Sequence, residues 1–374
     1  MQIEVKIVDN DKMLREFVDL PYKLYAGNRY WVPPMKADEL KALRADGNPA
    51  MDFCQARLWV AFSGGRCVGR IGAIVNRLWI EKNGRNYGRL TRFESIDDLQ
   101  VATLLLRTAE DWLRAQGMDH AEGPLGFTNL DHQGLLVEGH DWLPSVASDY
   151  SAAYYSRFFE ANGYRKEIDW LEFRLTFPAA LPQKSLKVAA MLKLRYGLRT
   201  VSFSTKAELA AKAPEIFDLF NEAFGQLFGT YRFPQPLIDF YISKYMPILV
   251  PRYVKMVEDA EGRAAGFIIA LPSLSRAMQK AGGRLLPLGW WHLMRALRHP
   301  REIDLLLTGV RPELQKLGVA ALLMNELWET AHADGVTFVE TTGMLENNHV
   351  AIQMWKSFEH IQHKRKRCYL KKII

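Results

Sequence analysis

A six-residue loop between an apolar strand and a helix carries the clearest chemical signal in the chain. It reads QKLGVA over residues 315–320 and follows an apolar run that begins at Leu305. Gly318 and Ala320 are small enough for a ligand to approach the backbone closely. The amides of a first helical turn have no partners inside the helix, and the helix dipole favours an anion. With the charge of Lys316 nearby, the loop predicts a pyrophosphate-binding site.

This segment resembles the GCN5-related N-acetyltransferase (GNAT) superfamily. The family's pyrophosphate loop has Arg or Gln, two variable residues, Gly, one variable residue, and Gly or Ala, and this form is met by Gln315, Gly318 and Ala320. The similarity continues over residues 310–355 in the family's order of strand, helix, strand and helix. Within that range the family's N-x-x-A-x-x-L/M signature is met by Asn348, Ala351 and Met354.

The resemblance implies an acyl-coenzyme A site in the second half of the chain. Pantetheine would insert between two splayed strands, 303–309 and 337–342, and its amides would pair with the free edge of the first. A backbone amide of that strand would stabilise the oxyanion formed at the acyl carbonyl. Acetyl-CoA is the expected cofactor, and other acyl-CoA esters stay open. The residues expected to contact it are Gly309, Val310, Gln315, Lys316, Leu317, Gly318, Val319, Ala320, Asn348 and Trp355.

Two departures from the family pattern bear on catalysis. Trp355 stands where the family usually has a tyrosine that protonates the leaving thiolate, and an indole N–H is not an acid at neutral pH. Glu359 and His360 replace the usual Gly-Phe pair. Two functions therefore stay open. One is an N-acyltransferase acting on a small-molecule amine with solvent-assisted proton transfer, and the other is a protein that binds acyl-CoA or a small metabolite without catalysis.

The same resemblance requires a group that takes a proton from the amine. Glu340 and Glu346 follow the loop and lie next to the expected strand opening. A carboxylate there could accept the proton directly or through a water molecule. An exposed strand or loop acid is an equally good interpretation of each residue, so both stand as candidate bases only.

The elements around the loop belong to a pattern that occurs twice. Residues 58–74 and 253–270 each predict a β-hairpin, and Gly69 and Gly266 lie four positions beyond the respective turn glycines. Each hairpin is followed later by a strand and an amphipathic helix, at residues 97–116 and 317–333.

We therefore predict an α+β fold of two tandem GNAT-like domains, each a mixed, mostly antiparallel sheet flanked by helices. Two prolines in the segment FPAALPQK interrupt both strand and helix, which places the join there. The predicted domains are residues 1–180, a degenerate GNAT-like copy, and residues 181–374, the acyl-CoA-binding domain.

The first half matches the family incompletely. Tyr155 stands where the family places its tyrosine, and Gly163 begins a pair equivalent to the usual Gly-Phe. The pyrophosphate loop is missing, because the strand enters the helix through Glu94, Asp97 and Asp98, whose charges repel a diphosphate. We interpret this half as a degenerate copy that supports the second.

An insertion over residues 273–301 is not needed by the family's usual short turn. It contains a helix with one apolar face, formed by Trp290, Leu293, Met294 and Leu297, while Arg295 and Arg298 point elsewhere. Three interpretations stay open: packing over the other domain, a lid over the acyl site, and docking on a membrane surface.

Composition bounds the remaining choices. The chain has 374 residues, is 48% hydrophobic and carries a formal net charge of +7. It has no run of the roughly 20 apolar residues that a membrane span needs and no secretion signal, so a cytoplasmic location is expected. The three cysteines are too few for a disulfide framework. The basic run 363–372 is interpreted as a solvated edge strand, no nucleic-acid partner is expected, and a homodimer stays open.

Overall fold

The chain divides into two compact units, which are described separately. The computed structural model describes residues 2–354 and 358–374, so Trp355 lies outside the described residues. Unit 1 consists of Met1–Trp170, Met278–Gly289 and Lys364–Ile374. Unit 2 consists of Leu171–Ala277 and Trp290–His363. The domain boundary between residues 180 and 181 stays a prediction.

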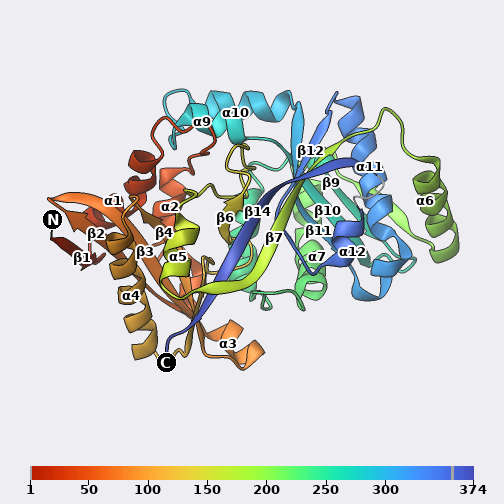
Figure 1. Cartoon of the computed structure of the whole chain (residues 1–374). Helices are drawn as coiled ribbons and strands as arrows, with labels where there is room; N and C mark the ends of the chain where they lie inside the picture. Colours follow the sequence, from red (N-terminus) through yellow and green to blue (C-terminus); the bar gives the residue numbers. More distant parts are fainter. Residues whose placement is uncertain (1, 355–357) are drawn as a thin grey trace. The chain divides into compact units, whose positions relative to one another are not determined.

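Unit 1 is built on a mostly antiparallel sheet (Figure 1). The first four strands pair antiparallel in chain order, and they are β1 (Ile3–Ile7), β2 (Cys54–Ser63), β3 (Arg66–Asn76) and β4 (Tyr87–Ser95). The fifth, β5 (His120–Gly123), runs parallel to β4. The last strand of the chain, β14 (Glu359–Lys372), pairs antiparallel with β5 and with the short β6 (Leu135–Glu138).

The helices of unit 1 are α1 (Asp11–Leu24), α2 (Lys36–Ala42), α3 (Arg77–Asn83), α4 (Leu99–Ala115) and α5 (Tyr155–Ala161), with a 3₁₀ turn η1 at Pro49–Asp52. Helix α4 packs on β3 and buries the predicted apolar stripe, including Leu105, Leu106 and Leu113. Its start is set by Asp98, whose side chain accepts a hydrogen bond from the amide of Gln100.

Unit 2 repeats the arrangement. Its sheet contains the second half of β7 (Arg165–Thr176) and five further strands: β8 (Arg199–Ser202), β9 (Val254–Glu258), β10 (Ala264–Pro272), β11 (Glu302–Val310) and β12 (Phe338–Thr341). All neighbours are antiparallel except β11 and β12, which run parallel. A two-residue strand, β13 (Met344–Leu345), pairs with β7.

The helices that begin in or belong to unit 2 are α6 (Gln183–Tyr196), α7 (Lys206–Phe224), α8 (Gln235–Tyr245), α9 (Ser275–Ala281), α10 (Gly289–Arg298), α11 (Val319–Ala333) and α12 (His349–Gln353), with 3₁₀ turns η2 (Pro251–Tyr253) and η3 (Pro312–Leu317). Helix α11 packs on β9, β10 and β11, and α6 packs beside it. Among the described residues, no helix combines the length and hydrophobicity needed to cross a bilayer.

The internal repeat has a clear packing basis. A Cβ added at Gly69 would meet Leu105 and Val101 of α4, and one added at Gly266 would meet Val319 and Leu323 of α11. In both units a glycine in the second strand of the hairpin lets the long helix lie close on the sheet. The predicted α+β fold with mixed, mostly antiparallel sheets is confirmed.

The interpretation of the basic run as a solvated edge strand is wrong. In β14, Lys364 is 1% exposed and Lys366 is 4% exposed, and the strand pairs with both β5 and β6. Arg367 donates from Nε and Nη2 to Asp169, a carboxylate that is fully buried. The charge of Arg367 is therefore neutralised inside unit 1.

Candidate functional site

Strand β11 in unit 2 extends beyond the end of its parallel neighbour, β12. The ladder joins Glu302 to Phe338 at one end and Leu305 to Thr341 at the other. Beyond it, the Thr342 amide donates to the Leu305 carbonyl at 3.2 Å, and the Thr342 hydroxyl donates to the Leu306 carbonyl at 3.0 Å. Within the described part of the chain, residues 307–309 form ladder pairs only with β10, so their other edge is open. The strands expected to separate, 303–309 and 337–342, form their last ladder pair at Leu305 and Thr341 and separate beyond it.

A β-bulge lies at the point where the two strands separate. The register with β10 shifts between Ile269 and Ala270, whose partners are Leu307 and Leu305, so Leu306 has no partner of its own. A bulge rotates the following backbone groups relative to the ladder. Because Leu306, Leu307 and Thr308 are partly exposed, the open edge is accessible where this rotation occurs.

The amino terminus of α11 has no side-chain cap. Gly318 is its N-cap and has φ +97°, a conformation that favours glycine. Glycine has no side chain with which to cap the first turn. The amide of Ala321 donates to the Gly318 carbonyl at 2.9 Å, so the amides of Val319 and Ala320 are the candidates to bind an acceptor. A Cβ at Gly318 would lie 3.3 Å from Val188 of α6. The position is thus restricted both by its backbone and by its neighbour.

The residues predicted as a loop are helical: 315–317 end the 3₁₀ turn η3, and 319 and 320 begin α11. Lys316 is exposed, and Leu317 is partly exposed. Gln315 donates from its side-chain amide to the carbonyl of Val310 at 3.2 Å, which holds the turn together. Val319 and Ala320 are buried in the core, and contact with a ligand would come from their backbone only.

Two further candidates hold the backbone around the site. Gly309 is buried beneath Phe267, and a Cβ there would lie 2.5 Å from that ring. Asn348 is the N-cap of α12, and its side-chain oxygen accepts from the amide of Ala351 at 3.2 Å. Both features fix the path of the chain. Whether either residue contacts a cofactor stays a prediction.

A buried polar cluster lies in unit 2 near the strand opening. Glu340 of β12 forms a hydrogen bond to Nε2 of His363 on β14, and Glu172 of β7 offers a carboxylate within 4.8 Å of both groups. Glu340 is also the ladder partner of Asp304, two residues before the bulge at Leu306. The arrangement couples an imidazole to a carboxylate, which is a pairing suited to proton transfer.

Sequence reasoning found one member of this cluster and missed the rest. Glu340 was a candidate base, whereas Glu346 lies between β13 and α12 and is not a member of the buried cluster described here. His363 belongs to the run interpreted as a solvated edge strand, yet it is 8% exposed. The available signal was the single histidine that opens the basic run in a β-rich segment.

Comparison with known proteins gives a consistent fold. No family model matches the chain. A tandem GNAT protein from the clavulanic acid biosynthesis pathway superposes over 100% of this chain and 99% of its own, with a TM-score of 0.57 and 16% identity. A glucosamine N-acetyltransferase region of a fungal β-N-acetylglucosaminidase gives 0.59 at 15% identity, over 99% of this chain and 38% of that one. The chain has the tandem GNAT fold.

Two curated bacterial proteins are similar over nearly their whole lengths. Protein YghO of Escherichia coli K12 is 28% identical, over 97% of this chain and 94% of its own. A protein named bacterial ceramide synthase, from Caulobacter vibrioides, is 26% identical, over 96% of this chain and 95% of its own. The similarity therefore includes both halves of the tandem GNAT fold.

In the first half of this tandem GNAT fold, the equivalent region is filled by protein groups. Tyr155 and Tyr25 both donate to the Glu94 carboxylate, at 2.8 and 2.6 Å, and the Tyr155 hydroxyl accepts from the amide of Ser95 at 2.9 Å. Burial raises the pKa of Glu94 to about 7. This buried network occupies the end of β4, where β11 keeps an open edge.

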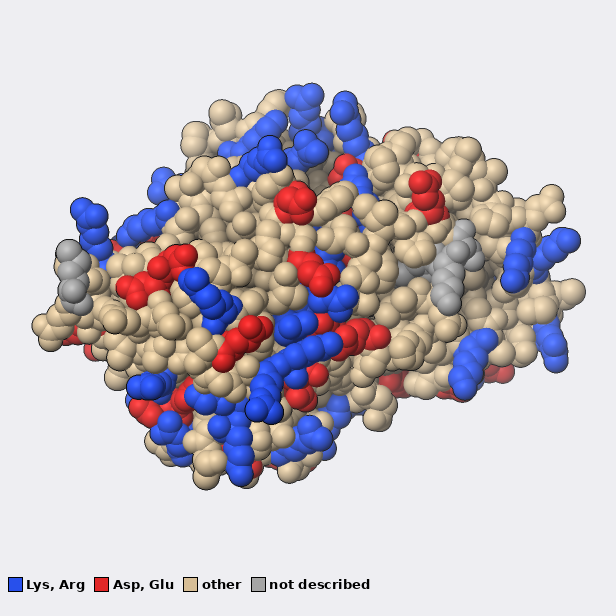
Figure 2. Space-filling model, in the orientation of Figure 1, with Lys and Arg blue, Asp and Glu red and all other residues tan. Residues whose placement is uncertain are grey.

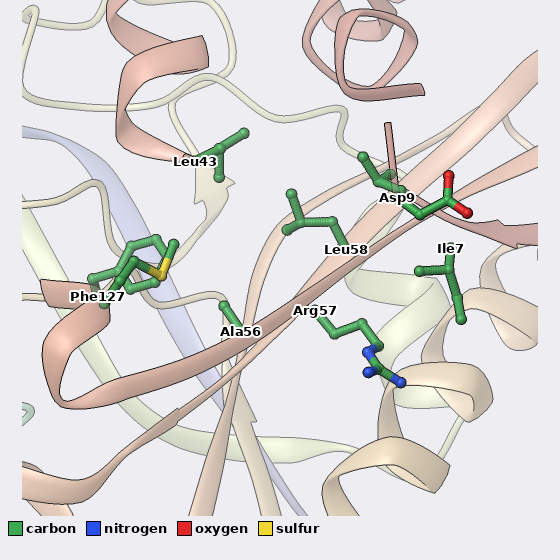
Figure 3. Close-up of a pocket in the computed structure, with 9 residues that line it drawn as sticks. Ile7, Asp9, Leu43, Ala56, Arg57, Leu58 and Phe127 are labelled. Carbon is green, nitrogen blue, oxygen red and sulfur yellow. The ribbon is translucent and has the colours of Figure 1, made fainter. Parts of the chain in front are cut away.

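The hollow drawn in Figure 3 lies in unit 1 and contains none of the predicted site residues. Leu43, Leu58 and Phe127 form apolar parts of its wall, and Asp9 and Arg57 add charged groups. It has neither an uncapped helix terminus nor a strand opening among the residues that line it. The candidate site of the tandem GNAT fold is therefore the α11 and β11 region of unit 2.

Proposed function

We propose that the protein is an acyl-CoA-dependent N-acyltransferase whose cofactor binds in unit 2. The observation that carries the proposal is the uncapped start of α11 at Gly318 beside the open edge of β11. Amides at residues 318–320 would hold the diphosphate, with Lys316 adding charge. The outer edge of residues 307–309 would pair with the pantetheine amides. The fold supports this chemistry because solved proteins with it include N-acetyltransferases.

Acyl transfer to an amine would form a C–N bond and break the thioester C–S bond. An acyl-CoA supplies the carbonyl carbon that the amine attacks. A backbone amide on the open edge of β11 would donate to the carbonyl oxygen as negative charge develops there. The Glu340–His363 pair would accept the proton that the amine loses, with Glu340 orienting the imidazole. The thiolate would take its proton from solvent, since position 355 is a tryptophan.

The acceptor we propose is the amine of a long-chain molecule. One relative along almost the whole chain is named as a ceramide synthase, and a ceramide is an N-acyl amide of a long-chain amino alcohol. The proposed acyl donors therefore run from acetyl-CoA to long-chain acyl-CoA esters. A cytoplasmic location and a homodimer are part of the same proposal.

A release assay for free thiol tests the activity directly. The purified chain would be incubated with acetyl-CoA or palmitoyl-CoA and a panel of amines that includes a long-chain amino alcohol. Amine-dependent thiol release supports the proposal. Calorimetric titration with the same two CoA esters runs in parallel, and absence of binding by both would refute the cofactor assignment.

A second function is favoured by one observation. Trp355 replaces the tyrosine that usually serves as the acid, which suits a protein that binds acyl-CoA without transferring the acyl group. The two functions separate cleanly in the same experiment. Binding by calorimetry without thiol release from any amine would favour the silent binding protein.

A further inference from the structure

Helix α10 leaves its large side chains exposed. Trp290 is 51% exposed, Trp291 is 44% exposed and Met294 is 42% exposed. Arg295 and Arg298 are also exposed. The guanidinium carbon of Arg295 lies 5.5 Å from the centre of the Trp291 ring. At 100° per residue these five side chains fall within an arc of about 140°. Arg295 and Arg298 therefore lie beside the exposed apolar side chains, and not away from them as the sequence pattern indicated. We call Trp290, Trp291, Met294, Arg295 and Arg298 the α10 patch.

The residues that precede the helix in sequence also expose apolar side chains. Leu286 is 76% exposed and Leu288 is 62% exposed, and Leu285 is also exposed. Most amphipathic helices bury their apolar side, whereas α10 fully buries only Gly289 and partly buries Leu293 and Leu297. Solvent-exposed leucines and tryptophans in one continuous segment indicate a surface that meets an apolar phase.

The charge around the patch indicates which apolar phase it meets. From Ser275 to Arg301 the sequence has six Lys and Arg residues and no Asp or Glu. Figure 2 shows Lys and Arg gathered along the top edge, where Figure 1 places α9 and α10. Tryptophan and arginine side chains suit the boundary between acyl chains and headgroups, and basic residues are attracted to anionic lipids. A second copy of this segment would carry the same charge and repel it.

We propose that the α10 patch docks the protein on the surface of an anionic lipid bilayer. The tryptophans and Met294 enter the headgroup region, and Arg295 and Arg298 contact lipid phosphates. This inference is independent of the acyl-CoA site, since none of the patch residues belongs to the α11 and β11 region. It explains the inserted segment that the GNAT pattern does not require.

Co-sedimentation of the full chain with vesicles tests the inference. Vesicles of phosphatidylglycerol and phosphatidylcholine should pellet the protein, and pure phosphatidylcholine vesicles should pellet much less. The double variant Arg295→Glu and Arg298→Glu should raise the lipid concentration for half-binding by at least roughly tenfold, because each basic residue near the surface contributes to attraction. The variant Trp290→Ser and Trp291→Ser should weaken binding as well.

A matched control uses another exposed helix surface. Leu194 on α6 is 90% exposed and Arg195 is adjacent to it, so Leu194→Ser with Arg195→Glu makes the same kinds of change elsewhere. That variant should bind vesicles like the parent, and unchanged thermal midpoints would show that all three variants fold. Equal vesicle binding by the parent and both α10 variants would overturn the proposal. So would a dimer in sedimentation velocity that the Trp290→Ser and Trp291→Ser variant dissociates, without any vesicle binding by the parent.

Discussion

The same supersecondary unit occurs twice in this chain, and its two copies treat charge at the strand opening in opposite ways. In unit 1 the third pair of the parallel ladder joins Arg89 to Glu122, with 3.8 Å between Nε and Oε1. In unit 2 the third pair joins Asp304 to Glu340. A buried cation and anion neutralise each other, whereas two carboxylates need further partners such as His363. The first copy pairs a cation with an anion at this point, and the second brings two carboxylates and an imidazole together.

The helix termini differ in the same sense. Asp98 places its own carboxylate on the first turn of α4, at 2.8 Å from the amide of Gln100. Gly318 leaves the first turn of α11 without a side-chain cap. An internal carboxylate fills the position that an external anion would need. The comparison indicates that a change of one residue at the N-cap can convert an anion site into an ordinary helix start.

The sharpest way to test this difference is to give unit 2 the cap of unit 1. Gly318→Asp should lower acyl-CoA affinity by at least roughly 100-fold, because a like charge about 4 Å from the diphosphate costs several kcal/mol in a partly buried site. Aspartate tolerates positive φ better than most residues, which limits the folding defect. Calorimetric titration with palmitoyl-CoA and acetyl-CoA measures the loss.

Gly335 provides the control for that substitution. It has φ +73° just beyond the carboxyl end of α11, with no heavy atom within 4 Å of an added Cβ. Gly335→Asp therefore imposes a similar backbone strain far along the same helix from the proposed cradle. Equal affinity loss in both variants would mean that helix stability, and not anion binding, explains the effect.

The second prediction concerns the proton acceptor in unit 2. His363→Gln and Glu340→Gln should each lower kcat for amine acylation by roughly 100-fold, the usual contribution of a general base, and should leave the Kd for acyl-CoA unchanged. Glu346→Gln is the matched change in a candidate outside the buried cluster, and it should keep nearly full activity. Full activity of both cluster variants would remove the Glu340–His363 pair from the mechanism.

Features of the fold and site could be predicted from the sequence where the interacting residues lie close together along the chain. The Gly69 and Gly266 echo, the α4 stripe and the cradle at Gly318 depend on residues near one another in sequence, where periodicity and turn chemistry predict structure. The Glu340–His363 pair could not be predicted in that way, because it joins two strands through sheet pairing. The basic run was misjudged for the same reason, since its partner Asp169 lies almost 200 positions away.

A third prediction uses the buried Glu94 of unit 1. Its folded-state pKa is about 7, raised from 4.5 by burial, so the folded state binds the proton more tightly than the unfolded state. The favourable contribution is present below pH 4.5 and is lost as the pH rises toward 7. In the parent, the free energy of unfolding should fall between pH 5 and pH 8 as Glu94 ionises. Glu94→Gln should make this fall smaller by an amount on the order of 2 kcal/mol, seen as a smaller drop in thermal midpoint over the same pH range. Identical pH profiles for parent and variant would contradict the raised pKa.

The smallest expected effect comes from removing the cap of unit 1. Asp98→Ala deletes the hydrogen bond to the Gln100 amide and should lower the free energy of unfolding by about 1 kcal/mol, measured by denaturant titration. Acyl-CoA binding to the whole chain should not change, because the strand end beside α4 remains closed by Glu94, Tyr25 and Tyr155. If the variant instead acquired a second acyl-CoA site in calorimetry, the cap alone would be what silences the first copy. We expect no second site, because protein groups fill the end of β4 and an anion site in this fold needs both an uncapped helix and an open strand edge.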